Sequence, residues 1–368
     1  MLESWIFGEF GSDRNDIGED FNNIVGKKCA NLGEMRRAGI NVPHGFALSL
    51  EAYERFMNET GAIDEIRKYL KTSDADPVNS AHSPKFEMAA KSLRNIVESK
   101  DMPHHMAAVI AKHYDELCEK VGMLDVPVAT RSSGAASHPG QFETFLNISS
   151  ISEVLKNIIK VWSSTFNARS LMVRARLGLP LDTDPIGVAV LQMVNAKSAG
   201  VMFTLNPVNG DPSKIAIGGN WGLGETVASG EVTNDQWILD KVTLEIIERD
   251  IALKNIECVF DNETGKTVNS EIPLERQTKS CLTDEEIYEL ARQAKRIEKH
   301  FGLPQDIEFV IDKNLPFPKN VIFVQTRPES IWNKKLTKPI LETKTEFGEY
   351  DIFSLLERSK NDGKRKTL

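Results

Sequence analysis

The sequence has 368 residues, of which 45 are basic and 53 acidic, so its formal net charge is -8. At roughly 150 residues per domain this length predicts two lobes or domains, and the acidic balance gives no overall electrostatic reason to bind nucleic acid or an anionic membrane. The composition, 40% hydrophobic and 27% charged, is that of a folded globular protein. The four cysteines stand singly, so we expect neither a zinc site nor a disulfide framework. No apolar run approaches the roughly 20 residues that span a bilayer, so we expect a soluble cytoplasmic protein.

The first third of the chain is predicted to be mainly helical. Its apolar spacing and capping residues predict helices over residues 28–38, ended by Gly39; 50–57, with Ser49 as the N-cap; and 105–121, ended by Gly122. Residues 72–84 are polar and contain two prolines, which predicts a loop or mobile connection. Ser150 and Glu153 form a capping-box pair, and the apolar spacing after them predicts one long helix that ends near Gly178.

The second half of the chain changes to a pattern of short strands. Apolar runs separated by Gly, Asn and Pro begin at residue 186 and read IGVAVLQMV, AGVMFTL, KIAI and WILD. Thr283 and Glu286 predict a capping box for a helix ended by Gly302, and the strands IEFVID and VIFVQT follow it. The expected domains are a helix-rich lobe over residues 1–185, a sheet-rich lobe over 186–335 and a charged tail or docking segment over 336–368.

The last two predicted strands carry the most informative polar pattern. Because side chains alternate along a strand, Asp306 and Glu308 share one face of the first strand, and Gln325 and Arg327 share one face of the second. If the strands pair as a hairpin, carboxylate and amide oxygens suited to Mg²⁺ converge with a guanidinium suited to phosphate. The alternative interpretation is a solvent-exposed polar strand face.

Other features favour a ligand site less specifically. Small residues over 131–140 and the glycines of GGNWGLGE (218–225) allow close backbone approach to a ligand, although the second segment does not match a Walker-type loop and a tight turn is its alternative. Lys28 is a candidate phosphate-binding lysine, against the alternative of an ordinary exposed lysine. None of the seven histidines has a compact context that would expose a nucleophilic ring, so we expect no covalent carrier among them.

Taken in order, several short blocks resemble the ATP-grasp domain of the phosphoenolpyruvate synthase and pyruvate phosphate dikinase family. They are VGKKCANLGEM (25–35) with VPHGF (42–46), TRSS (130–133), GQFET (140–144), SAGVMFT (198–204) with Asn206 and Pro207, NWGLGE (220–225), PQDIE (304–308) and VQTRP (324–328). The resemblance covers about residues 20–332. It implies an α/β (α+β), two-lobed ATP-grasp fold with the nucleotide in the cleft between the lobes.

The resemblance also implies roles for individual residues, with ATP and Mg²⁺ as cofactors. Lys28, Arg131 and Arg327 are implied to contact the phosphates and to act in catalysis, and Asp306 to lie at the phosphate end of the site. Gly140 and Thr144 would belong to the loop that covers the phosphates, and Gln192 would lie beside the adenine. Glu308 and Gln325 would bind the metal ion. The family's usual Gly-Gly-Lys reads Gly26-Lys27-Lys28 in this chain, so either lysine is a candidate. The 131–140 loop is shorter than in most relatives, which leaves its contacts open.

The implied activity is a dikinase-type transfer of the ATP β-phosphoryl group to a histidine, giving AMP and phosphate. Family members normally continue into a phosphohistidine domain with a G-G-x-T-C-H-like motif and then a substrate domain. We therefore expect a separate partner subunit to carry these parts. We expect no nucleic-acid or membrane partner. That architecture is similar to the ATP-binding subunit of phenylphosphate synthase, with phenol as final acceptor. The alternatives are a split nucleotide domain of phosphoenolpyruvate synthase or of an antibiotic phosphotransferase, and a non-catalytic ATP sensor.

Overall fold

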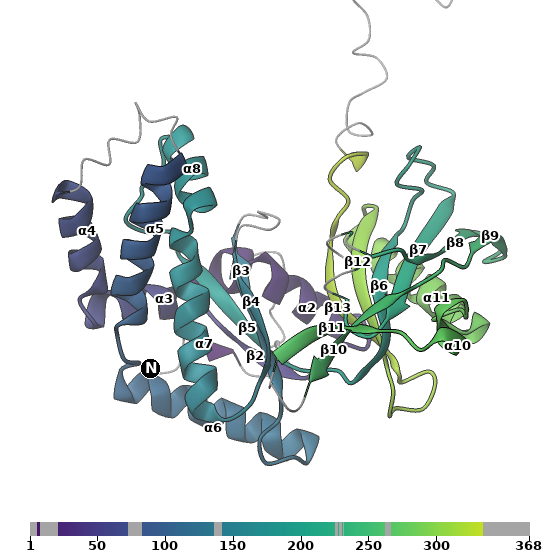
Figure 1. Ribbon diagram of the computed structural model, residues 1–368, viewed down its shortest axis with the longest axis horizontal. Helices are drawn as coiled ribbons and strands as arrows, with labels where there is room; N and C mark the ends of the chain where they lie inside the picture. Colours follow the sequence, from purple (N-terminus) through teal and green to yellow (C-terminus); the bar gives the residue numbers. More distant parts are fainter. Residues whose placement is uncertain are drawn as a thin grey trace, which may run out of the picture. The chain divides into compact units, whose positions relative to one another are not determined.

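The computed structural model describes residues 6–7, 21–72, 83–135, 142–224, 227, 230, 232–261 and 266–333. The chain divides into two units, Met1–Pro328 and Glu329–Leu368, and the second is described only over residues 329–333. The first unit contains two larger antiparallel sheets and a separate two-stranded ribbon, with helices packed on the sheets (Figure 1). The expected α/β architecture is therefore confirmed. No described helix is both long enough and apolar enough to cross a membrane.

The first sheet has five strands in the order β1-β2-β5-β3-β4, all antiparallel to their neighbours. Its strands are β1 (Ile6–Phe7), β2 (Gly45–Leu48), β3 (Val128–Gly134), β4 (Thr144–Ile148) and β5 (Ile186–Gln192). The helices of this lobe are α1 (Asn22–Val25), α3 (Leu50–Glu59), α4 (Ala62–Thr72), α5 (Ser83–Glu98), α6 (His104–Val121), α7 (Ile151–Ser163) and α8 (Ala168–Arg176).

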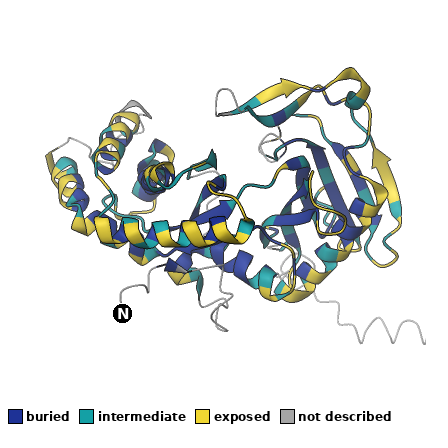
Figure 2. Ribbon diagram, turned by 90° about the horizontal axis from the view of Figure 1, so that it is seen from below, coloured by how far each residue is buried: buried dark blue, intermediate teal, exposed yellow. Residues whose placement is uncertain are grey.

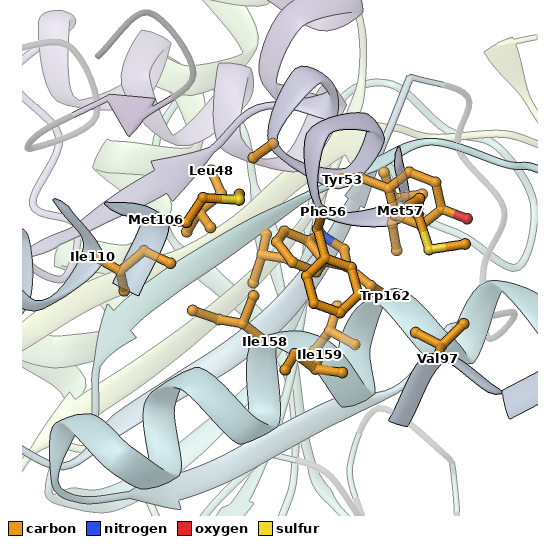
Figure 3. Packing of buried hydrophobic residues seen from close by; sticks show 14 of the residues in the cluster. Leu48, Tyr53, Phe56, Met57, Val97, Met106, Ile110, Ile158, Ile159 and Trp162 are labelled. Atoms are coloured by element: carbon orange, nitrogen blue, oxygen red, sulfur yellow. The ribbon is translucent and has the colours of Figure 1, made fainter. Parts of the chain in front are cut away.

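The core of the first lobe forms where α3 and α7 pack against the central strands. Trp162 of α7 is fully buried, and its ring centroid lies 5.0 Å from that of Phe56 and 6.3 Å from that of Tyr53, both in α3 (Figure 3). Val188 and Val190 of β5 belong to the same apolar cluster. Aromatic side chains of this size contribute much of the burial that stabilises a core.

The second sheet has six strands in the order β13-β12-β6-β7-β8-β9. These are β6 (Ala196–Phe203), β7 (Lys214–Trp221), β8 (Asp235–Asp240), β9 (Ile246–Asp250), β12 (Gln305–Asp312) and β13 (Val321–Pro328). The ribbon of β10 (Ile256–Asp261) and β11 (Lys266–Glu271), the short α10 (Leu274–Gln277) and the long α11 (Asp284–Phe301) complete this part. Buried residues are concentrated in the inner strands, whereas exposed residues lie on helix surfaces, in loops and on outer strands such as β9 (Figure 2).

One helix, α2 (Lys27–Arg37), joins the two sheets. Met35 lies in an apolar cluster that also contains Leu191 of β5 and Phe323 of β13. Asn31 of α2 donates a 2.8 Å hydrogen bond to the Thr326 carbonyl of β13. Strand β5 therefore contributes to two cores, because its alternating side chains enter one cluster on one face and the other cluster on the opposite face.

Most predicted helix ends are observed. Ser49 accepts a hydrogen bond from the Ala52 amide, the Thr283 capping box forms with Glu286, and Gly122 and Gly302 end their helices in the left-handed conformation. Gly302 is free to adopt this conformation because it carries no Cβ.

The predicted capping box and long helix after residue 150 are wrong. Ser150 has φ of 73° and makes no side-chain capping bond, so α7 begins without one. The helix then ends at Ser163, a 3-10 turn spans Ser164–Phe166, and α8 begins with Asn167 as its N-cap. The hydroxyl group of serine and the amide group of asparagine can form hydrogen bonds with nearby backbone groups in place of the helical ones. This competition favours the interruption between α7 and α8.

The pairing of β5 indicates where the two lobes divide. Strand β5 pairs with β2 and β3, so a boundary between residues 185 and 186 falls before the central strand of the first sheet. By sheet membership the first lobe continues to Gln192 and the second begins at Ala196. The 336–368 segment and most of the 72–84 loop lie outside the described residues.

A buried ion pair stabilises the second lobe. Lys254 and Asp235 are both 0% exposed, and the Lys254 ammonium lies 2.5 Å from the Asp235 carboxylate. That carboxylate also accepts hydrogen bonds from the amides of Ala252 and Cys281, at 3.0 and 2.8 Å. The carboxylate therefore joins two separate segments, residues 252–254 and the backbone at Cys281, to β8.

We expect Lys254→Met to lower the free energy of unfolding by about 3–5 kcal/mol, because it leaves a buried carboxylate without its counter-ion. Lys214→Met is the matched control, since Lys214 pairs with Asp240 where β7 begins and β8 ends, both side chains are partly exposed, and the loss should be much smaller. Urea unfolding of both variants measures the difference. Equal losses in the two variants would contradict the anchoring role of the buried pair.

Candidate functional site

The β12–β13 hairpin brings together the polar residues predicted from strand alternation. Asp306 lies opposite Arg327, and Glu308 lies opposite Gln325. The Gln325 amide donates a 2.8 Å hydrogen bond to the Glu308 carboxylate, and Arg327 Nε donates one of 2.8 Å to Asp306. The Glu308 side chain is 25% exposed and that of Asp306 is 13% exposed, so this is a half-buried cluster and not a fully solvated strand face.

A β-bulge in β13 decides which side chains reach this cluster. The pairing register shifts between Glu308 and Phe309, which leaves Val324 as an extra residue without a direct partner on β12. Because of this extra residue, Phe323 enters the apolar core while Gln325 turns to the opposite face, beside Glu308. Simple alternation would have placed Phe323 and Gln325 on the same face.

Arg131 of β3 reaches this hairpin from the other sheet. Its Nη2 donates to Glu308 at 3.1 Å and to the Gln325 amide oxygen at 3.3 Å, and its Nη1 donates to the Val324 carbonyl at 3.3 Å. The side chain is 18% exposed, and its buried Nε has no hydrogen-bond partner among the described residues. The guanidinium therefore holds the hairpin and retains a donor for a further acceptor.

Lys28 enters the same cluster from the first turn of α2. Gly26 precedes it with φ of 79°, and a Cβ built at Gly26 would lie 1.8 Å from the Ser133 carbonyl oxygen. Only glycine allows this approach, which brings the start of α2 against β3, where the Cys29 amide donates to Ser133 Oγ at 3.1 Å. The pKa of Lys28 is lowered to about 8, chiefly by burial and also by the positive charge of Arg131, while Glu308 opposes the shift. These neighbours favour Lys28 over Lys27 as the lysine of the site.

An apolar cavity of about 230 Å³ lies between the sheets beside this cluster. Arg131 and Glu308 line it at their side, together with Thr144, which pairs with Arg131 across β3 and β4. Gln192 also lines the cavity, at the end of β5. The rest of the wall is Pro43, Ala129, Leu146, Leu191, Met193, Val194, Gly200, Val201, Leu223, Gly224, Phe309, Val310 and Val324. An apolar slot with charged groups on one side suits a flat aromatic ring that carries an anionic group.

The structure brings eight of the nine predicted site residues to this cluster or to the adjoining cavity, and their roles stay predictions. Six form the charged cluster, namely Lys28, Arg131, Asp306, Glu308, Gln325 and Arg327, and two more, Thr144 and Gln192, line the apolar cavity. Gly140 lies outside the described residues. The apolar wall was missed because its residues come from six strands and three connecting segments with no shared local signal; the part of it that the sequence indicated was the glycine-rich segment GGNWGLGE.

The donor set fits a hard divalent cation that also binds phosphate. Among the described residues no group of three or more His, Cys, Asp or Glu side chains could hold a metal ion by itself. Glu308, Asp306 and the Gln325 amide instead offer two carboxylates and a carboxamide on one hairpin. Mg²⁺ typically takes one or two carboxylates and completes its shell with water and substrate phosphates.

Comparison with known proteins identifies relatives across most of the chain. Residues 22–347 match the family model described as pyruvate phosphate dikinase, AMP/ATP-binding domain. A probable phosphoenolpyruvate synthase of Staphylothermus marinus is 37% identical over 93% of this chain and 44% of its own length. The phosphoenolpyruvate synthase of Aeropyrum pernix is 36% identical (87% and 42%), and a probable one of Methanothermobacter thermautotrophicus is 37% identical (85% and 45%). The chain spans less than half the length of these relatives.

The lowered pKa of Lys28 gives a pH dependence for the ligand-free protein. Its pKa is about 8 in the folded chain and 10.5 in the reference state, so between these values the unfolded chain binds more protons. The free energy of unfolding should therefore rise with pH across this window, by up to about 3 kcal/mol. We expect the rise to vanish in Lys28→Met and to persist in the neighbouring Lys27→Met, as measured by urea unfolding at several pH values. An identical rise in all three proteins would show that Lys28 is not desolvated.

Proposed function

The chain belongs to the pyruvate phosphate dikinase AMP/ATP-binding family, and from this premise we propose that it binds Mg-ATP between its two sheets and sends the β-phosphoryl group to a histidine on a partner subunit. ATP, water and the histidine would give AMP, inorganic phosphate and phosphohistidine. One observation carries the proposal: Arg131 of the first sheet meets Glu308 and Gln325 of the second sheet beside an apolar cavity.

The residue types suit this chemistry. The apolar cavity suits the adenine ring, with Gln192 beside it, and the phosphates would extend toward Arg131, Lys28 and Arg327. ATP carries about four negative charges near neutral pH, and cations aimed at the phosphates stabilise the charge that shifts during phosphoryl transfer. Glu308 and Gln325 would hold Mg²⁺, which when bound neutralises and orients the phosphate oxygens.

The names of the relatives favour one of the expected acceptors over the other. The three quoted relatives are named phosphoenolpyruvate synthase or probable phosphoenolpyruvate synthase. We therefore propose that the chain serves as the nucleotide-binding part of a phosphoenolpyruvate synthase-type dikinase, with pyruvate as the final acceptor. The expected likeness to the phenylphosphate synthase subunit, with phenol as acceptor, has no support from these names.

We expect the purified chain to bind Mg-ATP but to form little AMP until a subunit carrying the phosphohistidine domain is added. The reason is that the seven histidines of this chain lack the context of a covalent carrier. Calorimetry measures ATP binding, and product analysis with pyruvate and with phenol identifies the acceptor. Stoichiometric AMP formation by the chain alone, with phosphate on one of its own histidines, would contradict the partner requirement.

We expect Arg327→Lys to slow AMP formation about 30-fold or more in the presence of the partner, a loss of about 2 kcal/mol in transition-state stabilisation. A guanidinium can bridge two oxygens, whereas an ammonium is a compact point charge on a different stem. Arg67→Lys is a matched control, because Arg67 Nε also bonds an aspartate oxygen at 2.8 Å, in Asp182, but lies outside the site. A folded Arg327→Lys protein with turnover equal to the control would exclude a bridging role.

A further inference from the structure

We propose that the ion pair between Arg94 and Glu143 is a positioning element, which holds the start of β4 and thereby fixes Thr144 at the wall of the ligand cavity. Arg94 lies in α5, and Glu143 directly precedes β4. Thr144 lines the cavity, whereas the cavity wall includes neither member of the pair. The inference rests on the proposed function only for the identity of the ligand, Mg-ATP.

Thr144 occupies a position that the first sheet alone holds weakly. It is the first residue of β4, and β4 lies at the edge of the sheet, next to β3. The pairing of these strands contains a register shift and ends with Arg131 opposite Thr144. Strand ends with few partners open readily, so the position of Thr144 depends on a further contact. Because Arg131 and Thr144 both line the cavity, a displaced Thr144 would change the wall beside the charged cluster.

Arg94 supplies this contact through both of its terminal nitrogens. Nη1 donates to Glu143 Oε1 at 2.5 Å and Nη2 donates to Oε2 at 2.8 Å. Arg94 Nε donates to Glu98 at 3.3 Å, one turn further along α5, which orients the guanidinium. Two parallel bonds fix the rotation of the Glu143 carboxylate as well as its distance. Successive side chains of an extended segment point to opposite sides, so a Glu143 held by α5 leaves Thr144 directed to the cavity.

The break between α7 and α8 provides a second hold on the same residue. Ser164 lies in the 3-10 turn, where its hydroxyl accepts a 3.2 Å hydrogen bond from the Glu143 amide and donates one of 2.7 Å to the Val161 carbonyl. The Ser163 hydroxyl donates to Glu98 at 2.5 Å. The backbone and the side chain of Glu143 are therefore both held by elements outside the sheet.

The exposure of the pair separates a positioning role from a purely structural one. The side chains of Arg94 and Glu143 are 27% and 36% exposed. Ion pairs with this access to solvent contribute little to the free energy of unfolding. The placement of a residue that contacts a ligand, in contrast, strongly affects binding and turnover. Loss of the pair should therefore weaken ligand binding much more than it lowers stability.

The test measures the affinity for Mg-ATP by calorimetry on the purified chain, so it requires no partner subunit. We expect Arg94→Gln and Glu143→Gln each to weaken binding about tenfold, while the thermal midpoint falls by no more than about 3 °C. Thr144→Ala should also weaken binding. In the Thr144→Ala background Arg94→Gln should add less than about twofold, because the pair acts through Thr144.

Arg55→Gln is the matched control. Arg55 pairs with Glu51 within α3, so loss of this pair releases no other element, and the affinity should stay within about twofold of the wild type. Glu143→Gln serves as the test variant if Arg94→Gln fails a thermal melt.

Hydrogen exchange of the Glu143 amide gives a readout that does not depend on nucleotide. This amide is bonded to Ser164, and we expect Arg94→Gln to speed its exchange at least about fivefold in the ligand-free chain. Unchanged exchange, wild-type affinity in the folded variant, or full additivity with Thr144→Ala would overturn the inference and leave the proposed function standing. If the wild-type chain does not bind Mg-ATP, the proposed function is wrong, and the exchange rate alone decides whether the pair holds the strand.

Discussion

The site depends on one contact between the two sheets, the guanidinium of Arg131 held by Glu308, Gln325 and the Val324 carbonyl. A charged side chain that is mostly shielded from water needs partners, and these partners come from β12 and β13, 177 to 194 residues further along the chain. The same contact fixes the charged side of the apolar cavity, because Arg131 and Glu308 both line it. The same few hydrogen bonds therefore link the two sheets and position the charged groups of the site.

The bulge at Val324 shows how a small backbone irregularity creates the site. Without the extra residue, the side chain of Phe323 and that of Gln325 would point to one side of β13, and one of them would be misplaced. With it, the aromatic ring lies in the core and the amide lies beside Glu308. The bulge also leaves the Val324 carbonyl available to Arg131 at 3.3 Å. Bulges of this kind frequently occur beside functional residues, where they redirect a side chain.

Local sequence patterns predicted several of the elements and, provided that the last two strands pair, one half of the site. The alternation of Asp306, Glu308, Gln325 and Arg327 was sufficient to place four side chains together, because strand geometry is local and the hairpin is short. Arg131 and Lys28 could be assigned only through the family resemblance, since their approach to the hairpin depends on α2 and on the packing of the sheets. The break after Ser163 and the positive φ of Ser150 escaped the periodicity argument, because tertiary packing can override capping preferences.

Strand β5 lies at the centre of the first sheet and contributes apolar side chains to both main cores, which makes the two lobes mutually dependent for folding. A fragment that ended just before it would present the unpaired edges of β2 and β3 to solvent. Such edges recruit strands from neighbouring molecules, so the fragment would be expected to aggregate. A gene divided between the two halves of the fold would therefore have to keep residues 186–192 with the first half.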